Sequence, residues 1–428
     1  MNTFSSTSLL HNATHQQLEH AVANNHAELF ALNVTSQGGN VTNKNGLTWT
    51  HNGVGKQAMV PFPKLTATNA GPLLDEMMDQ FRQQPPGSAG CWSLYPPQPA
   101  DLGVKLLARG FQPGWQPSWM YLDLEKINTD HPVPSTLEVR ADDLTFIDDV
   151  PHLPYRGNDG AVSNELLQQH PERAQRFLAL LDGKIVAHSC VFYTTGALGI
   201  AGLYNVGVVP HVRNRGIGKA VVLAACLHAK EKGYNYAMLN GTGRRMYEQV
   251  GFRWMSNGLT WWLMTKNYIS DKPSPARIAL IEAIGNGHIA LLSKSAESFS
   301  IAELNTPITN GMTLMRLAIH CKQPASAEWL VSHGVAYTAL DAWDMGWKDR
   351  AAALLKKDSN EVNRLHGELQ ATLLHTAAER NDIALAQLAL GAHPDLTIKD
   401  TMYHATPLDW ARHLNRGAIA KLIEEYKV

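Results

Sequence analysis

Hydrophobic and polar positions alternate most regularly in the middle third of the chain, about residues 136–268. Two apolar runs, 176–181 and 185–193, stand on either side of Asp182 and Gly183. An Asp-Gly pair between two apolar runs is the turn signature of a β-hairpin. The pattern therefore predicts two antiparallel strands here.

A strand followed by a helix is expected directly downstream. Residues 203–209 form another apolar run, and residues 219–232 have a helical pattern that Gly233 ends. Strands and helices in this order indicate a mixed α/β domain. Shorter strands are expected over 137–140, 236–239 and 259–264, and a short helix over 246–250.

The first segment, about residues 1–135, has a weaker pattern of the same kind. Thr14 and Gln17 predict a capping box at the start of a helix. Residues 46–51 alternate like a strand and end at Asn52-Gly53, a hairpin turn signal. Further helices are expected over 72–83 and 100–108, and further strands over 91–95 and 119–124.

The two segments share an echo. Gly110-Phe111 and Gly251-Phe252 each follow a helical stretch and precede an aromatic strand. Either an internal duplication or chance explains this echo.

A Pro- and Ser-containing linker at 270–275 separates these segments from an almost wholly helical one, residues 276–428. Thr338, Thr372 and Thr406 each open a helical stretch, and successive members are 34 residues apart. Repeats of this period are typical of helical solenoids.

Composition restricts the partners that we expect. The net charge of -1 over 428 residues gives no long-range attraction to nucleic acid or to a membrane surface. Apolar runs are too short to cross a bilayer, and the amino terminus lacks a signal-peptide pattern. Four scattered cysteines and the absence of an HExxH motif predict reduced thiols, a cytoplasmic location and no metal.

The most informative stretch runs from Asn205 to Ala220, where a strand, a proline, a basic glycine-containing turn and a helix follow one another. The first amides of a helix have no internal partner and lie at the positive end of the helix dipole, which suits a phosphate. Gly216 and Gly218 would let an anion approach the backbone closely. By spacing alone, a purely structural turn with solvated basic residues is favoured over a phosphate site.

The residues in this stretch resemble a known family. Arg213, Gly216 and Gly218 form the Arg-x-x-Gly-x-Gly signature of the GNAT N-acetyltransferases, and Asn240 with Tyr247 to Phe252 is similar to a second block of that family. The resemblance covers about 136–268. It implies an α/β (α+β) acyl-CoA N-acyltransferase fold with acetyl-CoA as co-substrate.

The resemblance also implies roles for individual residues. Asn240 would contact the cofactor arm or fix the strand beside it. Tyr247 would protonate the departing thiolate, although a core aromatic beside Phe252 is the alternative reading. The cofactor-binding residues would be Val206, Val208, Arg213, Asn214, Arg215, Gly216, Ile217, Gly218, Lys219 and Asn240.

The general base is not evident from the sequence. Many members of the family carry a carboxylate on the strand before the turn, and here that strand, residues 203–207, has none. Asp159, Glu165 and His188 are alternatives, as is a water relay through backbone carbonyls and Tyr204.

The flanking segments resemble known modules as well. Residues 1–135 resemble a degenerate GNAT-like half that lacks the Arg-x-x-Gly-x-Gly signature, and would close the acceptor site or stabilise its partner domain. Residues 276–428 resemble ankyrin repeats, which would bind a protein, mediate self-association or pack internally.

These resemblances leave three functions open. The first is a small-molecule N-acetyltransferase acting on a polyamine, an amino acid or an amine-bearing antibiotic, with resistance as a consequence in the last case. The second is a protein acetyltransferase whose targets are recruited by the repeats. The third is a non-catalytic acyl-CoA-binding module.

Overall fold

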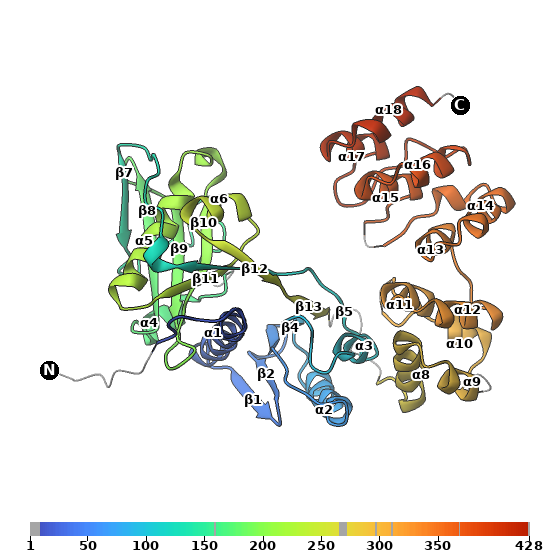
Figure 1. Cartoon of the computed structure of the whole chain (residues 1–428), viewed down its shortest axis with the longest axis horizontal. Coiled ribbons are helices and arrows are strands. Elements are labelled where there is room, and N and C mark those ends of the chain that lie inside the picture. The colour runs from blue at the N-terminus through green and yellow to red at the C-terminus, as the bar shows by residue number, and fades with distance from the viewer. Residues whose placement is uncertain are drawn as a thin grey trace. The chain divides into compact units, whose positions relative to one another are not determined.

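The computed structural model describes residues 9–157, 160–264, 272–295, 298–309, 311–367 and 369–426 (Figure 1). The chain divides into two compact units. Unit 1 comprises residues 1–103 and 113–270, and unit 2 comprises residues 104–112 and 271–428. The domain boundaries at 135, 268 and 276 stay a prediction.

Unit 1 is built around a seven-stranded sheet with the order β12-β6-β11-β10-β9-β8-β7. The predicted hairpin is present, because Asp182 and Gly183 both have positive φ and Leu181 pairs with Lys184. The strands of this sheet are β6 (Ser118–Asp123), β7 (Leu137–Ala141), β8 (Ala174–Leu181), β9 (Lys184–Tyr193), β10 (Ala201–Val208), β11 (Tyr236–Asn240) and β12 (Arg253–Asn257).

A second sheet has the order β3-β4-β13-β5, and β1 pairs with β2 in a separate hairpin. That hairpin turns at Asn45-Gly46, both with positive φ, so the hairpin turn expected at Asn52-Gly53 was wrong. Both Asn-Gly pairs suit a type I′ turn, and strand pairing decided between them. The strands are β1 (Asn40–Lys44), β2 (Leu47–His51), β3 (Gln57–Pro61), β4 (Ser88–Ser93), β5 (Gln112–Pro113) and β13 (Leu259–Leu263).

The two halves of unit 1 exchange strands. β6, from the first half of the chain, lies between β12 and β11 in the large sheet, where Trp119 is opposite Asn240. β13, from the second half, pairs with β4, where Trp262 is opposite Gly90. Each exchanged strand follows one of the two Gly-Phe pairs, so neither half can complete its sheet alone.

Helices cover the two faces of the large sheet. Neighbouring residues of a strand point to opposite faces. Phe192 and Tyr204 pack in one core cluster with residues of α1, whereas Val191 and Leu203 pack in another with residues of α5. α1 and α5 therefore lie on opposite faces. The helices of unit 1 are α1 (His15–Ser36), α2 (Ala70–Gln83), α4 (Asn164–Gln169), α5 (Ile217–Glu231) and α6 (Arg244–Val250), and α3 (Leu102–Leu107) starts in unit 1 and ends in unit 2.

Unit 2 is a stack of short helices. Thr338, Thr372 and Thr406 are the N-cap residues of α13, α15 and α17, each with a capping box, as the 34-residue spacing predicted. The helices are α8 (Pro275–Asn286), α9 (Ile289–Ser295), α10 (Ile301–Asn305), α11 (Leu314–His320), α12 (Pro324–Ser332), α13 (Ala339–Asp344), α14 (Lys348–Lys357), α15 (Leu373–Arg380), α16 (Ile383–Leu390), α17 (Pro407–His413) and α18 (Gly417–Glu425).

Residues 104–112, although distant in sequence, are part of the core of unit 2. Leu107 and Ala108 belong to the same core cluster as residues of α8 and α11. Glu282 on α8 pairs with Lys105 at 3.2 Å and with the buried Arg109 at 2.9 Å. This segment therefore covers the apolar end of the helical stack that α8 would otherwise expose.

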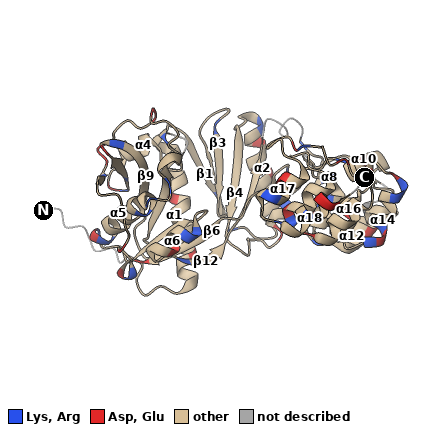
Figure 2. Ribbon diagram, turned by 90° about the horizontal axis from the view of Figure 1, so that it is seen from above, with Lys and Arg blue, Asp and Glu red and all other residues tan. Residues whose placement is uncertain are grey.

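Positively and negatively charged residues alternate along the ribbon without a large segment of one sign (Figure 2). The described residues contain no cluster of three or more metal-binding side chains, and no described helix has the length and apolarity needed to cross a membrane.

Candidate active site

Strands β10 and β11 open into a wedge in the middle of the large sheet. They pair in parallel at Ala201 and Gly202. Beyond that point β10 continues to Val208 alongside β9, with an irregular register between Tyr204 and Gly207. The edge of β10 that faces away from β9 is therefore open from Leu203 onward, and its backbone groups can pair with an extended ligand.

Asn205 fixes the irregularity in β10. Its φ of +50° is in the left-handed region, where asparagine is tolerated better than most residues. Its side-chain oxygen accepts the N–H of Ala161 at 2.8 Å, and its amide group donates to the carbonyl of Val162 at 2.9 Å. A loop preceding α4 is thereby tied to the open strand.

The basic turn after β10 leads into α5. Gly216 is the N-cap residue with φ of +83°, and as a glycine it has no side chain that could cap the helix. The first intrahelical bond runs from the N–H of Ala220 to the carbonyl of Gly216. The amides of Ile217, Gly218 and Lys219 therefore precede the ladder of the helix, as an anion site at a helix N-terminus requires.

Glycine at 216 is also required by the fold. A Cβ at this residue would lie 2.3 Å from the carbonyl oxygen of Pro132, so a side chain would push the 127–136 connection away from the turn. A Cβ on Gly218 would lie 3.0 Å from the sulfur of Met246. Both glycines of the signature thus permit close packing around the turn.

The basic and polar side chains of the turn extend outward. Arg213 folds back and donates from Nε to the carbonyl of Val208 at 3.1 Å. Lys219 donates to Gln249 at 3.2 Å, and Asn214 adopts a positive φ. Arg215 is exposed. The positive charge of the turn thus stays near the end of the open strand.

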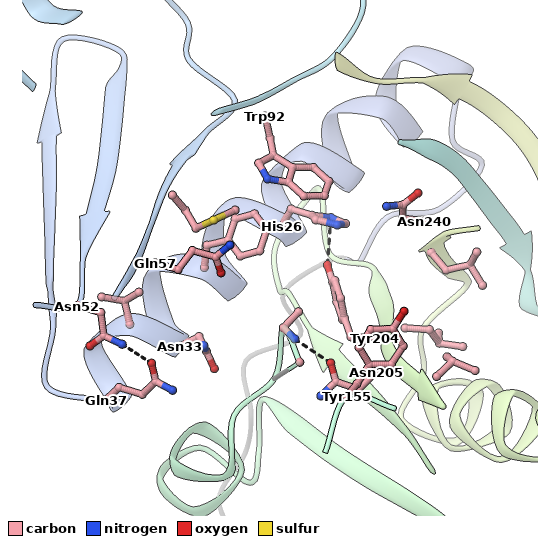
Figure 3. Close-up of a pocket in the computed structure, with 18 of the residues that line it drawn as sticks. His26, Asn33, Gln37, Asn52, Gln57, Trp92, Tyr155, Tyr204, Asn205 and Asn240 are labelled. Atoms are coloured by element: carbon pink, nitrogen blue, oxygen red, sulfur yellow. Dashed lines mark hydrogen bonds between the residues drawn. The ribbon is translucent and has the colours of Figure 1, made fainter. Parts of the chain in front are cut away.

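A cavity of about 1000 Å³ lies at the other end of the wedge (Figure 3). Its lining combines the open part of β10, the end of β11 and α6 with residues of α1, β3, β4 and β13. Both halves of unit 1 therefore contribute to it. Val206, Asn240 and Tyr247 line this cavity, whereas Val208 and the turn residues 213–219 lie outside its lining.

Tyr247 on α6 borders the cavity with a ring held in place by an edge contact to Phe252, at 6.0 Å between centroids. Its hydroxyl has no hydrogen-bond partner in the described part of the chain. Burial raises the pKa of Tyr247 to about 12, and Tyr155 acts in the same direction. The phenol is therefore protonated at neutral pH and available as a donor.

Asn240 ends β11 beside the wedge. Its side-chain oxygen accepts the backbone N–H of Ser118 at 3.0 Å, which ties β11 to the start of the exchanged strand β6. The amide group of Asn240 is left to face the cavity that it lines. This hydrogen bond holds the end of β11 in place, and both roles expected for Asn240 toward the cofactor stay predictions.

The candidate bases differ in position. His188 lies outside the cavity lining, and its Nε2 is 2.7 Å from the carbonyl oxygen of Pro154. Glu165, in the first turn of α4, lines the cavity. Asp159 is outside the described residues. Tyr204 lines the cavity, as a relay through its hydroxyl would require.

Sequence reasoning missed His26 and Asn25 on α1. The hydroxyl of Tyr204 donates to Asn25 at 2.7 Å and lies 3.0 Å from Nδ1 of His26, and Figure 3 shows this contact. Nδ1 of His26 is also 3.2 Å from the carbonyl of Val22. Burial keeps the His26 ring neutral, and its tautomer sets whether Nδ1 donates to these oxygens or accepts from the Tyr204 hydroxyl.

Burial lowers the pKa of His26 to about 3 and the pKa of His188 to about 4, against the backbone carbonyls that raise them. We therefore expect acid to destabilise unit 1. Unfolded histidines take up protons below about pH 6.5, whereas these two stay neutral in the folded protein. The stability that these neutral histidines contribute is complete above pH 6.5 and is lost as the pH falls toward 4. Between pH 7 and pH 5, the free energy of unfolding should fall by about 2 kcal/mol per histidine.

Urea unfolding at pH 7, 6 and 5, followed by tryptophan fluorescence, measures this loss. The His188→Gln variant should lose about 2 kcal/mol less than the wild type over this range. His15→Gln, at an exposed position, is the matched control and should keep the wild-type slope. If the free energy of unfolding changed equally with pH in all three proteins, His188 would not be the source of the acid sensitivity.

The opened parallel strand pair and the uncapped helix that follows it define the acyl-CoA N-acyltransferase fold. Residues 141–252 match the model of the acetyltransferase (GNAT) family. The chain therefore carries a GNAT acetyltransferase domain, and the prediction of that family is confirmed.

Solved structures of the family are similar to this chain. A GCN5-related N-acetyltransferase from Kribbella flavida is 16% identical, with 58% of this chain and 96% of that chain covered and a TM-score of 0.44. A tandem GNAT protein from the clavulanic acid biosynthesis pathway, without AcCoA, is 17% identical, with 53% and 79% covered and a TM-score of 0.39.

One further protein is similar to part of this chain. A protein of Rickettsia bellii described as an ankyrin repeat protein is 27% identical over 134 residues. These residues are 31% of this chain and 17% of that protein, so the chain spans a small part of its length. Its name fits the ankyrin repeats predicted for residues 276–428.

Proposed function

We propose that unit 1 is an N-acetyltransferase that moves acetyl from acetyl-CoA to a primary amine of a small molecule, by direct attack in a ternary complex. The observation that carries this proposal is the wedge between β10 and β11. At one end are the amides of residues 217–219, which precede the hydrogen-bond ladder of α5, and at the other end is a cavity of about 1000 Å³. The first end suits a diphosphate, and the second suits an acceptor beside a thioester.

Acetyl-CoA, when bound, supplies an activated acyl group as a thioester. The amides of residues 217–219 would bind its diphosphate, with Arg213, Asn214, Arg215 and Lys219 adding positive charge and donors. The open edge of β10 at Val206 and Val208 would pair with the extended arm, and a backbone N–H would polarise the thioester carbonyl. Asn240 would keep the wedge open beside it.

The reaction needs three proton transfers. The amine nitrogen would form a bond to the carbonyl carbon while the carbon–sulfur bond breaks, and Tyr247 would donate its hydroxyl proton to the departing sulfur. The nitrogen would lose its surplus proton as the amide forms, and water in the cavity would carry that proton back to the Tyr247 oxygen. The ammonium form of the acceptor loses a proton first. Glu165 or a water held by Tyr204 would accept it, since both residues border the cavity.

The first half of unit 1 would close the acceptor site. His26, Phe30 and Asn33 on α1, and Trp92 on β4, line the cavity opposite β10. A helix and a sheet edge in this place exclude water from the reacting groups. This supports an acceptor-binding role for a segment that lacks the cofactor signature.

A second candidate is a protein N-acetyltransferase whose targets are recruited by the repeats, and the helical array of unit 2 favours it. Such arrays present extended surfaces to protein partners or to a second copy. A third candidate, a non-catalytic acyl-CoA-binding module, would use the turn and the wedge without Tyr247.

One assay separates these candidates. The purified chain is incubated with acetyl-CoA and single amines or lysine-containing peptides, and free thiol release is measured. We expect release that depends on a small amine. Release with peptides alone would favour the second candidate, and binding of acetyl-CoA without any release would favour the third.

A further inference from the structure

The end of the cavity remote from the wedge carries amide side chains in fixed orientations (Figure 3). Asn33 accepts the backbone N–H of Ser163 at 2.9 Å, which leaves its NH₂ group for the cavity. Gln37 accepts a hydrogen bond from Asn52, so Gln37 keeps its NH₂ group and Asn52 keeps its carbonyl oxygen. Gln57 adds one more donor and acceptor. Donors and acceptors side by side match hydroxyl groups, each of which both donates and accepts.

A flat aromatic wall lies beside these amides. Trp262 on β13 is opposite Gly90 on β4. A Cβ on Gly90 would lie between 2.8 and 3.2 Å from three atoms of the Trp262 ring, so the ring lies across the glycine. Trp92 and Met59 are on the same face of the sheet, since each lies opposite or two residues from Gly90. This wall can stack on the C–H face of a saturated ring.

Charge is scarce around the cavity. Lys56 and Glu165 are the charged side chains among its described lining residues, since His26 is kept neutral by burial. A polyamine carries several ammonium groups and needs several carboxylates, and a free amino acid needs a partner for its carboxylate, usually arginine. The described lining contains one carboxylate and no arginine.

We propose that the acceptor is a hydroxyl-rich ring bearing a single amine, the amino-sugar class. This inference rests on the proposed function and narrows its acceptor. The ring lies against Trp262, its hydroxyls bind Asn33, Gln37 and Asn52, and its amine points toward the wedge, where Tyr204 and Tyr247 border the cavity. Polyamines and peptides are poorer acceptors, because the cavity lacks the charges that would bind them.

The first test compares acceptors with the full chain and acetyl-CoA. Glucosamine is the probe, and spermidine, lysine, phenylethylamine and a lysine-containing peptide are the competitors. We expect kcat/KM for glucosamine to exceed that of each competitor at least about tenfold, which is the scale of one well-placed set of polar contacts. A higher value for any competitor overturns the inference and leaves the proposed function standing.

The second test removes the aromatic wall. Trp262→Ala should raise KM for glucosamine about 30-fold, the size of effect that a buried tryptophan contact usually has, with kcat and KM for acetyl-CoA nearly unchanged. Gly90→Ala should act in the same direction by lifting the ring from the sheet. Trp254→Ala is the matched control, because Trp254 is exposed and outside the cavity lining.

A binding measurement separates failure of this inference from failure of the proposed function. Glucosamine should quench the tryptophan fluorescence of the chain without acetyl-CoA, and Trp262→Ala should abolish the quench. Quenching without thiol release would keep the amino-sugar site and refute the enzyme. Thiol release with another amine, without quenching by glucosamine, would refute the amino-sugar site and keep the enzyme.

Discussion

Replacing Gly216 by valine is expected to abolish binding of acetyl-CoA. A β-branched residue at φ of +83° costs about 1–3 kcal/mol in backbone strain. Its Cβ would also lie 2.3 Å from the carbonyl oxygen of Pro132, so the turn must shift. The amides of residues 217–219 would then lose their common direction, and we expect affinity to fall at least about 100-fold.

Gly233→Val is the matched control for that variant. Gly233 follows the other end of α5 with φ of +86°, and a Cβ there would meet no atom within 4 Å. The Gly233→Val variant therefore introduces the same kind of backbone strain. It causes no collision, and it lies at the opposite end of the helix from the amides of residues 217–219. Calorimetric titration with acetyl-CoA and a thermal melt are measured on both variants. If a folded Gly216→Val variant bound acetyl-CoA as tightly as the wild type, the turn would not be part of the binding site.

The sequence predicted the turns and helix starts that depend on residues close together in the chain. Asp182-Gly183 turns the β8–β9 hairpin because both residues accept a positive φ. Three threonines 34 residues apart cap helices, because Thr338 and Thr406 each accept the backbone N–H three residues on and Thr372 contacts the His375 ring three residues on. The glycine-containing turn likewise predicted that a helix follows it, and α5 begins directly after Gly216, which has a positive φ. In each case the cause lies within a few residues of its effect.

Long-range pairing was beyond the sequence pattern. The exchange of β6 and β13 joins strands that lie more than a hundred residues apart, and an apolar run does not indicate which neighbour it will pair with. The echo of Gly110-Phe111 and Gly251-Phe252 marks the two exchanged strands, yet it carries no register. The cavity is built by this exchange, so its walls could not be assigned from the sequence.

The same reason explains why His26 was missed. It is 178 residues from Tyr204, with which it makes contact, and it belongs to a helix in the half that lacks the cofactor signature. A histidine among many scattered ones gives no signal until a strand is placed against its helix. The residues of the turn 213–219 and Tyr247 could be named from the sequence, because each lies in one of the two short blocks that resemble the family.

Tyr247→Phe is expected to lower kcat about 100-fold, the usual contribution of a positioned general acid, while affinity for acetyl-CoA changes less than about twofold. The phenyl ring keeps the edge contact with Phe252, so the cavity wall stays in place. Burial that raises the pKa of Tyr247 to about 12 keeps its proton available throughout the neutral range. The wild-type rate should therefore show no alkaline loss from this group below about pH 11.

Tyr193→Phe is the control that makes this result specific. The hydroxyl of Tyr193 is buried without a hydrogen-bond partner in the described part of the chain and lies outside the cavity lining, so its removal should leave kcat unchanged. Both variants lose one buried-tyrosine oxygen and keep their rings. A fall in kcat for Tyr247→Phe alone assigns the proton to that hydroxyl. Equal rates for both variants and the wild type would leave Tyr247 as a core aromatic and move the proton source to water.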